Sequence, residues 1–208
     1  MLRDDRLPFH FGAEHIMAMP AVPGRRWSVR EVRQLIEEAP LATPRYELVA
    51  GELLVTPSPA ALHQNAVAFL LAMLIPYVRK HLIGVAYTSP FDVELEPESL
   101  VQPDVFVAST QEARRLLTAM PARQLLLAVE VISPSSARYD RVTKRALYQR
   151  HVPEYWVIDL NARLIERWLP NDDRPEIIVD TLAWVPAEAS EPFTLELPDY
   201  FADVYLER

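Results

Sequence analysis

Two carboxylates stand in apolar runs where acidic side chains are rare. Glu130 lies near the end of the run Leu125–Ile132 (LLLAVEVI), and Asp104 lies within Val101–Val107 (VQPDVFV). Runs this rich in Leu, Val and Ile predict strands buried on both faces, where an isolated charge is very costly. Each acid therefore needs a positive partner, which is either a Lys or Arg side chain or a metal ion. Two strands that each carry one inward acid form the frame of a cation site.

A basic helix is expected to follow the Glu130 strand. Asp140, Lys144 and Tyr148 recur at intervals of four residues, so they fall on one stripe of that helix. The strand ends at Ser133–Pro134 and the helix starts a few residues later, so Lys144 is expected to reach the acids. Two carboxylates and one lysine suit phosphodiester hydrolysis: a metal polarises the phosphate and lowers the pKa of its bound water. The lysine stabilises charge on the phosphoryl oxygens or orients the attacking water.

Simpler interpretations of the same residues stay open. Asp140 and Lys144 suit an ordinary surface ion pair at i,i+4 spacing, and Asp140 is expected to be the N-cap of its helix rather than a ligand. Tyr148 suits packing as well as it suits a hydrogen bond to a phosphate or an acid. Glu130 and Lys144 can also form a buried ion pair without any metal. That last alternative predicts that the double substitution Glu130→Gln and Lys144→Met leaves stability nearly unchanged.

Bulk composition narrows the class of protein. A chain of 208 residues, 50% of them hydrophobic, is long enough for one compact domain with a full core. The absence of cysteine excludes disulfides and thiolate metal sites, which fits a cytoplasmic protein. The formal net charge of −8 argues against a broad nucleic-acid-binding surface. A local exception is the basic cluster after the Glu130 strand, where we expect nucleic-acid contacts from Arg138, Arg141 and Arg145.

No membrane association is expected. The segment Met1–Met19 lacks the apolar stretch of a secretory signal. The longest apolar stretch, Ala66–Tyr77, has about a dozen residues, against the roughly 20 that a membrane span needs.

The expected architecture is α/β: one central mixed sheet flanked by helices, in a single domain. Residues 1–26 form an N-terminal arm, residues 27–185 form the domain, and residues 186–208 form a tail of loops and short turns packed on it. The expected hairpin turns at Gly51, and Ser28 with Glu31 makes a capping box. Helices are expected at 29–38, 60–80, 111–118 and 140–151. Strands are expected at 46–49, 52–55, 85–95, around Asp104 and Glu130, and at 155–159, 164–169 and 177–179.

An ordered series of sequence blocks resembles the putative restriction endonuclease family, also called the Uma-two family. The blocks are Tyr46–Leu53 (YELVAGEL), Pro57–Pro59 with His63, Pro103–Asp104, Glu130–Ser136 (EVISPSS), Asp140 with Lys144 and Tyr148, and Val152–Asp159 (VPEYWVID). This family belongs to the PD-(D/E)XK nuclease superfamily, and the resemblance covers roughly residues 44 to 170. It implies a restriction-endonuclease-like fold and a Mg²⁺-dependent endonuclease that hydrolyses DNA phosphodiester bonds with a metal-activated water.

The resemblance also implies roles for individual residues. Asp104 and Glu130 would be ligands to Mg²⁺, with Mn²⁺ as a plausible substitute, and the backbone carbonyl of Val131 would complete the ligand set. In the parent motif a lysine follows the second acid by two residues, where this chain has Ile132. The resemblance places that role on Lys144 of the following helix.

Three accessory residues and a homodimer are expected on the same ground. Glu47 resembles an additional acid that many superfamily members supply, although an ordinary hairpin charge is an equal alternative. His63 matches a family position, but a capping or core-edge role competes with a functional one. Tyr148 is the third accessory residue. Nucleases of this type often work as homodimers, and an edge strand within 155–169 is the expected interface.

Two other functions remain open. The chain can be a catalytically inactive nucleic-acid-binding or regulatory protein that retains the nuclease fold. It can also hydrolyse RNA or a small phosphodiester instead of DNA. The sequence defines neither the DNA target nor the biological pathway.

Overall fold

The computed structural model describes residues 19–20, 25–39, 44–133, 136–187 and 189–208. Its centre is a six-stranded sheet in the order β4-β5-β6-β7-β8-β9, in which β6 and β7 are parallel and the other neighbours are antiparallel. The strands are β4 (Gly84–Thr88), β5 (Val105–Ser109), β6 (Leu127–Ile132), β7 (Tyr155–Asp159), β8 (Leu164–Trp168) and β9 (Glu176–Ile178). The predicted α/β fold with a central mixed sheet is confirmed.

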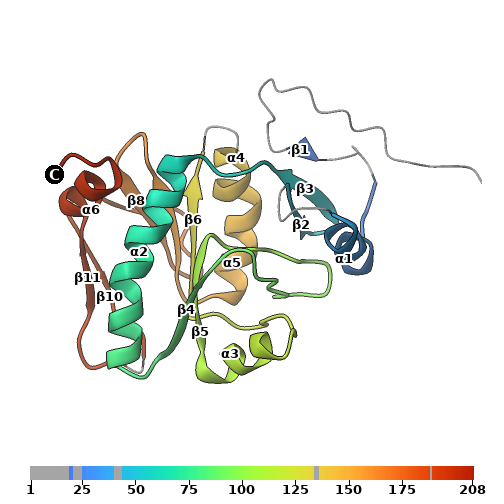
Figure 1. The fold of residues 1–208 in the computed structure, drawn as a ribbon, viewed down its shortest axis with the longest axis horizontal. Helices are drawn as coiled ribbons and strands as arrows, with labels where there is room; N and C mark the ends of the chain where they lie inside the picture. The colour runs from blue at the N-terminus through green and yellow to red at the C-terminus, as the bar shows by residue number, and fades with distance from the viewer. Residues whose placement is uncertain (1–18, 21–24, 40–43, 134–135, 188) are drawn as a thin grey trace, which may run out of the picture.

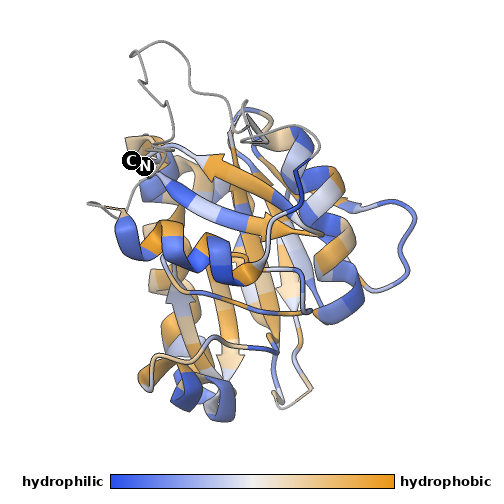
Figure 2. Ribbon diagram, turned by 90° about the vertical axis from the view of Figure 1, so that its right-hand side faces the viewer, coloured by the Kyte–Doolittle hydropathy of each residue, from blue (hydrophilic) through white to orange (hydrophobic). Residues whose placement is uncertain are grey.

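Helices flank this sheet, and α2 and α5 lie on opposite sides of β6 (Figure 1). The helical elements are α1 (Val29–Glu38), α2 (Ala61–Lys80), α3 (Thr110–Leu117), α4 (Ala137–Tyr139), the π-helical turn η1 (Asp140–Lys144), α5 (Arg145–His151) and α6 (Leu197–Val204). The strands of the sheet are mainly hydrophobic, and hydrophilic segments lie on the surrounding helices (Figure 2).

The alternation of side chains along β6 decides which helix Glu130 meets. Val129 and Val131 pack in the core on the α2 side of the sheet. Ala128 and Ile132 pack in the core on the α5 side, and Glu130 shares their face because side chains two apart point the same way. Glu130 therefore points towards the helical stretch that carries Lys144.

A hairpin beside the sheet supplies another part of the site. It consists of β2 (Arg45–Val49) and β3 (Glu52–Thr56), and β1 (Met19–Pro20) pairs with β3. Ala50 and Gly51 both have positive φ, 50° and 81°, as the tightest hairpin turns require. Leu48 exchanges two backbone hydrogen bonds with Leu100, which ties the hairpin to the segment leading to Asp104. The capping box predicted at the start of α1 is present.

The helix around Lys144 starts earlier than predicted. Residues 137–151 are helical without a break, through α4, η1 and α5. Ser136 occupies the N-cap position, and the Asp140 N–H donates to the Ser136 carbonyl at 3.0 Å. The prediction that Asp140 is the N-cap is therefore wrong: the backbone turns into a helix one turn earlier, and Asp140 lies inside it.

Two further predictions about elements were wrong. Residues 91–95 are not a strand: β4 ends at Thr88, and among residues 91–95 only Val93 forms bridges, with Val101 and Ala122. The C-terminal tail is more ordered than loops and turns, because β10 (Thr181–Trp184) pairs with β11 (Phe193–Glu196), and α6 follows. Phe193 and Leu195 alternate with exposed polar residues and complete the core beside α2, a short period-two pattern that the acidic, proline-bearing composition obscured.

The edge strands of the central sheet are β4 and β9. Because β7 and β8 lie inside the sheet, the prediction of an edge strand within 155–169 was wrong.

The helix α2 is long and apolar enough to cross a membrane by length and composition, with a mean hydropathy of 1.5. In this structure Leu70, Leu74 and Val78 of α2 pack in the core.

The predicted N-terminal arm, residues 1–26, lies outside the described residues except for 19–20 and 25–26.

Candidate active site

Four acidic side chains from four separate elements line one cavity of about 280 Å³. They are Glu47 of β2, Asp104 just before β5, Glu130 of β6 and Asp140 of η1, and their exposed fractions lie between 1% and 3%. Such a concentration of buried acids is unfavourable unless cations or protons compensate it.

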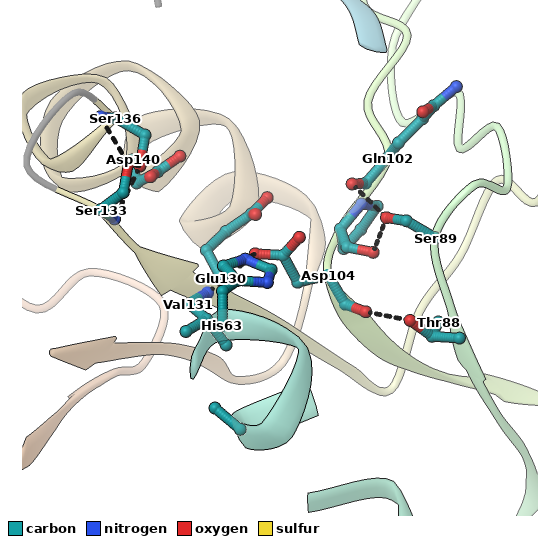
Figure 3. Close-up of polar contacts among 12 residues, drawn as sticks. His63, Thr88, Ser89, Gln102, Asp104, Glu130, Val131, Ser133, Ser136 and Asp140 are labelled. Atoms are coloured by element: carbon teal, nitrogen blue, oxygen red, sulfur yellow. Dashed lines mark hydrogen bonds and ion pairs between the residues drawn. The ribbon is translucent and has the colours of Figure 1, made fainter. Parts of the chain in front are cut away.

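Strand register brings Asp104 and Glu130 together. Val105 of β5 pairs with Val129 of β6 in an antiparallel register, so Asp104, which precedes Val105, lies opposite Glu130, which follows Val129. Residues opposite each other in this way share one face of a sheet. The Val131 N–H donates to Asp104 Oδ2 at 2.9 Å, which anchors the Asp104 carboxylate beside β6 (Figure 3).

Asp104 has two further partners. Arg45 Nη1 lies 2.9 Å from Oδ1, and His63 Nε2 lies 3.0 Å from Oδ2. Burial by itself would raise the pKa of Asp104, but His63 and Arg45 outweigh that effect and hold the pKa well below its usual range. Asp104 is therefore an ionised carboxylate, as a metal ligand must be.

Lys144 joins the other three acids. Its Nζ lies 2.8 Å from Glu47 Oε2, 3.0 Å from Glu130 Oε1 and 3.6 Å from Asp140 Oδ1. Burial opposes its charge, but these three acids outweigh burial and raise the pKa of Lys144 well above its usual value. Lys144 is therefore a fixed positive charge at the centre of the acids. The turn that carries it is π-helical, a geometry frequent at functional sites.

One lysine does not balance the acids around it. Burial raises the pKa of Glu130 well above its usual value, and neighbouring acids add to this effect against the pull of Lys144. Burial likewise raises the pKa of Asp140 to about 6. Among the described residues, four carboxyl groups thus face two fixed cations, Arg45 and Lys144, an excess of two acids.

Two neighbours orient the acids. The Tyr148 hydroxyl donates to Glu130 Oε1 at 2.9 Å, and its ring packs against Tyr155 with the ring centroids 4.7 Å apart. The Gln102 N–H donates to Glu47 Oε1 at 2.8 Å. Glu47 and Tyr148, both predicted as accessory residues, therefore contact the same cluster as Lys144.

The donors suit magnesium. All four acids offer oxygen ligands, which hard cations prefer. Within the described residues, no three His, Asp or Glu side chains already converge in the arrangement of a metal site. Magnesium needs only one or two carboxylates, because it keeps several waters and takes phosphate oxygens. Asp104 and Glu130 would hold it, next to Val131, which lines the same cavity.

None of the three arginines predicted to contact nucleic acid lines this cavity. Arg141 is held by Asp159 Oδ2 at 2.7 Å and by Glu166 Oε1 at 2.6 Å. The Arg145 guanidinium lies 4.7 Å from the centroid of the Trp168 ring. Arg138 is exposed. Of the three arginines, Arg138 is the one whose side chain faces solvent most openly.

Two site residues escaped sequence reasoning. Arg45 precedes the Tyr46–Leu53 block, and no spacing links it to Asp104, which lies 59 residues away. Asp140 was predicted as a cap because its type and position fit one. The sequence feature that could have indicated Asp140 as a site residue was its i,i+4 spacing to Lys144. In the structure these two side chains form a buried ion pair and not a surface pair.

A mixed sheet with one buried acid just before β5 and another on the neighbouring β6, completed by a lysine from the following helix, defines a restriction-endonuclease-like protein. The family model Uma2, described as putative restriction endonuclease, matches residues 31–202. The chain therefore belongs to the Uma2 family, the Uma-two family that its sequence blocks resemble, and this membership supports a nuclease function.

The fold also occurs in a solved structure. The chain is similar to a putative nuclease belonging to DUF820 from Anabaena variabilis, with a TM-score of 0.69 and 19% sequence identity. The similarity covers 83% of this chain and 98% of that chain. At this identity the likeness concerns the fold alone. No curated protein matches the chain.

Proposed function

We propose that this protein is a Mg²⁺-dependent endonuclease that hydrolyses phosphodiester bonds in DNA. The observation that carries the proposal is the uncompensated acid cluster around Asp104, Glu130 and Lys144. In the part of the chain that the structure describes, its acids exceed its fixed cations, and it lines a cavity large enough for a phosphate group. Membership in the Uma2 family supports the same class of reaction.

Each residue has a defined task in this proposal. Asp104 and Glu130 bind Mg²⁺, which when bound supplies a Lewis acid for the phosphate and a water of lowered pKa. Lys144 Nζ carries a fixed charge within 3.0 Å of Glu130, where it stabilises negative charge on the phosphoryl oxygens. Tyr148 holds the Glu130 carboxylate in place through its hydrogen bond.

Arg45 and His63 fix the orientation of Asp104. Together with the Val131 N–H they contact both Asp104 oxygens, so the carboxylate has little freedom to rotate. A ligand held this firmly presents its remaining lone pairs in one direction.

DNA is the proposed substrate because the family is described as restriction endonucleases. The net charge of −8 does not suit a broad phosphate-binding surface. Binding is therefore expected to rest on a few short-range contacts near the cavity, with Arg138 as the exposed arginine closest in sequence to the site.

The test is cleavage of supercoiled plasmid by the purified protein with Mg²⁺, with Mn²⁺ and with a chelator. Asp104→Asn and Glu130→Gln preserve side-chain volume and are each expected to reduce cleavage at least a hundredfold. Asp173→Asn is the matched control, because Asp173 is exposed. Thermal unfolding of each variant establishes that the fold is intact.

Unchanged cleavage by the Asp104→Asn and Glu130→Gln variants would contradict the proposal. A second candidate follows from the closed network of ion pairs around Lys144 and Asp104, which also suits a stable but inactive nucleic-acid-binding protein. That candidate predicts no Mg²⁺ or Mn²⁺ binding in a calorimetric titration. Cleavage of RNA or of a small phosphodiester, but not of plasmid, would change the substrate and keep the chemistry.

A further inference from the structure

A second and larger cavity, of about 590 Å³, lies beside the acid cluster. It is lined by residues of α1, of β2, of the segment after β4 and of the end of α3, among them Ile36, Tyr46, Phe91, Gln102 and Met120. Arg45 lines both this cavity and the cavity of the acids, so the two are neighbours. The volume falls within the roughly 300–1,000 Å³ range of small-molecule sites.

Gln102, in the cavity wall, carries a buried acceptor that has no partner among the described residues. Gln102 is 4% exposed, and its Nε2 donates to Asp92 Oδ1 at 2.9 Å. This contact defines the amide orientation, since the reverse one would set the amide oxygen against a carboxylate. Gln102 Oε1 is buried, and it has no hydrogen-bond partner among the residues that the structure describes. Buried polar atoms are almost always paired, so this one needs an explanation.

Arg45, which lines the same cavity, holds a buried donor. Arg45 Nη1 is used by Ser89 and Asp104, both at 2.9 Å. Its Nε–H is buried and has no acceptor within the described part of the chain. Among the described residues of the wall, Gln102 thus has one unused acceptor and Arg45 has one unused donor.

The remaining wall offers flat apolar surface. The Phe91 ring packs edge-on against Tyr87 and Phe106, with centroid distances of 5.1 and 6.3 Å, so its position is well supported. Tyr46 supplies a second ring, and Met120 lines the rim with 46% exposure. Aromatic faces of this kind accept a stacked nucleobase of any sequence.

We propose that this cavity binds one unpaired nucleobase of the substrate strand, next to the phosphate that the acid cluster receives. A nucleobase has flat apolar faces, an N–H for Gln102 Oε1 and a carbonyl or ring nitrogen for Arg45 Nε–H. The inference rests on the proposed nuclease function. Because a base stacked inside a duplex cannot enter a side cavity, the preferred substrate has an unpaired nucleotide, in a single strand or a mismatch.

Binding is tested without catalysis. The four 2′-deoxynucleosides are titrated into the full-length protein in a chelator, and binding is followed by calorimetry and by saturation-transfer NMR. The Gln102→Leu variant removes the amide and keeps the backbone N–H that holds Glu47, and it is expected to weaken the best nucleoside at least tenfold. The Gln124→Leu variant is the matched control, because Gln124 is exposed and lies outside the cavity lining.

A second variant tests the cavity without altering Gln102, in case the Gln102→Leu variant does not fold. Met120→Trp fills the cavity from its half-exposed rim without touching the Gln102 amide, and it is expected to abolish nucleoside binding. Cleavage of an oligonucleotide with one unpaired nucleotide is expected to be at least tenfold faster than cleavage of the fully paired duplex. Both variants should remove that preference.

The two hypotheses fail separately. Mg²⁺-dependent cleavage with no nucleoside binding at millimolar concentration, or with binding that neither variant weakens, overturns the base pocket and leaves the nuclease. Nucleoside binding that depends on Gln102, in a protein that cleaves no phosphodiester, overturns the nuclease and supports the base pocket.

Discussion

Lys144 Nζ lies 3.0 Å from Glu130 Oε1, although the two residues belong to different elements and are 14 positions apart. The lysine of the parent motif normally follows the second acid on the same strand, where this chain has Ile132. Here the helix after β6 returns over the sheet face that carries Glu130, and its π-helical turn ends at Lys144. The ammonium group thus reaches the acid from a different element.

This contact predicts a large loss of stability on removal of the lysine. Lys144→Met leaves Glu47 and Glu130 buried without their shared cation, so the free energy of unfolding should fall by about 3–5 kcal/mol. Urea unfolding at neutral pH measures the change.

The ion pairs of Lys144 with Glu47 and Glu130 also predict which further substitutions restore the stability lost in Lys144→Met. Because Lys144 also contacts Glu47, Glu130→Gln is not sufficient to compensate for Lys144→Met. The triple substitution Glu47→Gln, Glu130→Gln and Lys144→Met should recover most of the loss. Equal stability of the double and triple variants would show that Glu47 does not depend on Lys144.

Because the pKa of Asp140 is raised, the free energy of unfolding should depend on pH. Burial raises the pKa of Asp140 to about 6 from 3.8, so the folded protein binds this proton more tightly than the unfolded chain does. The contribution is therefore fully present below about pH 4 and is lost as the pH rises through 6. Its size is at most roughly 3 kcal/mol.

The comparison of wild type with Asp140→Asn isolates this contribution. The variant lacks the titrating group, so its stability should exceed that of the wild type above pH 6 and should vary less between pH 4 and 7. Unfolding free energies at several pH values, without divalent metal, make the comparison. Parallel pH profiles for the two proteins would refute the assignment.

Tyr148 is expected to position Glu130 without taking part in the chemistry. Tyr148→Phe removes the hydroxyl that donates to Glu130 Oε1 and should cost about 1.5–3 kcal/mol of stability. Cleavage should fall less than it does for Glu130→Gln and should keep its requirement for Mg²⁺. A loss of cleavage as complete as that of Glu130→Gln would assign Tyr148 a direct role.

Arg138 and Arg141 should separate DNA binding from stability. Arg138 is exposed, so Arg138→Ala should leave stability within about 0.5 kcal/mol. It should weaken DNA binding and reduce the salt dependence of the affinity by about one unit.

Arg141→Ala serves as the matched variant. It removes the contacts with Asp159 and Glu166 and should cost about 1 kcal/mol of stability, with little change in the salt dependence. Fluorescence anisotropy at several salt concentrations and thermal unfolding measure both effects. An unchanged salt dependence for Arg138→Ala would exclude Arg138 as a phosphate contact.

The sequence alone determined most of the central strands and helices and the two principal acids, Asp104 and Glu130. The apolar runs around Asp104 and Glu130 predict buried strands because their composition leaves no solvent face; β6 confirms this for Glu130, and β5 confirms it from Val105 onward, with Asp104 just before the strand. The capping box at Ser28 and the turn at Gly51 could be predicted from the sequence because local backbone geometry depends on residue type.

Only the tertiary structure decided which charges meet. Arg45 and Asp104 are 59 residues apart, and their contact depends on how the hairpin docks beside the sheet. The burial of Asp140, the ion pairs that hold Arg141, and the Gln102 Oε1 that has no partner among the described residues follow from the same packing. Charge compensation depends on distance and solvent exclusion in three dimensions, which no spacing along a chain specifies.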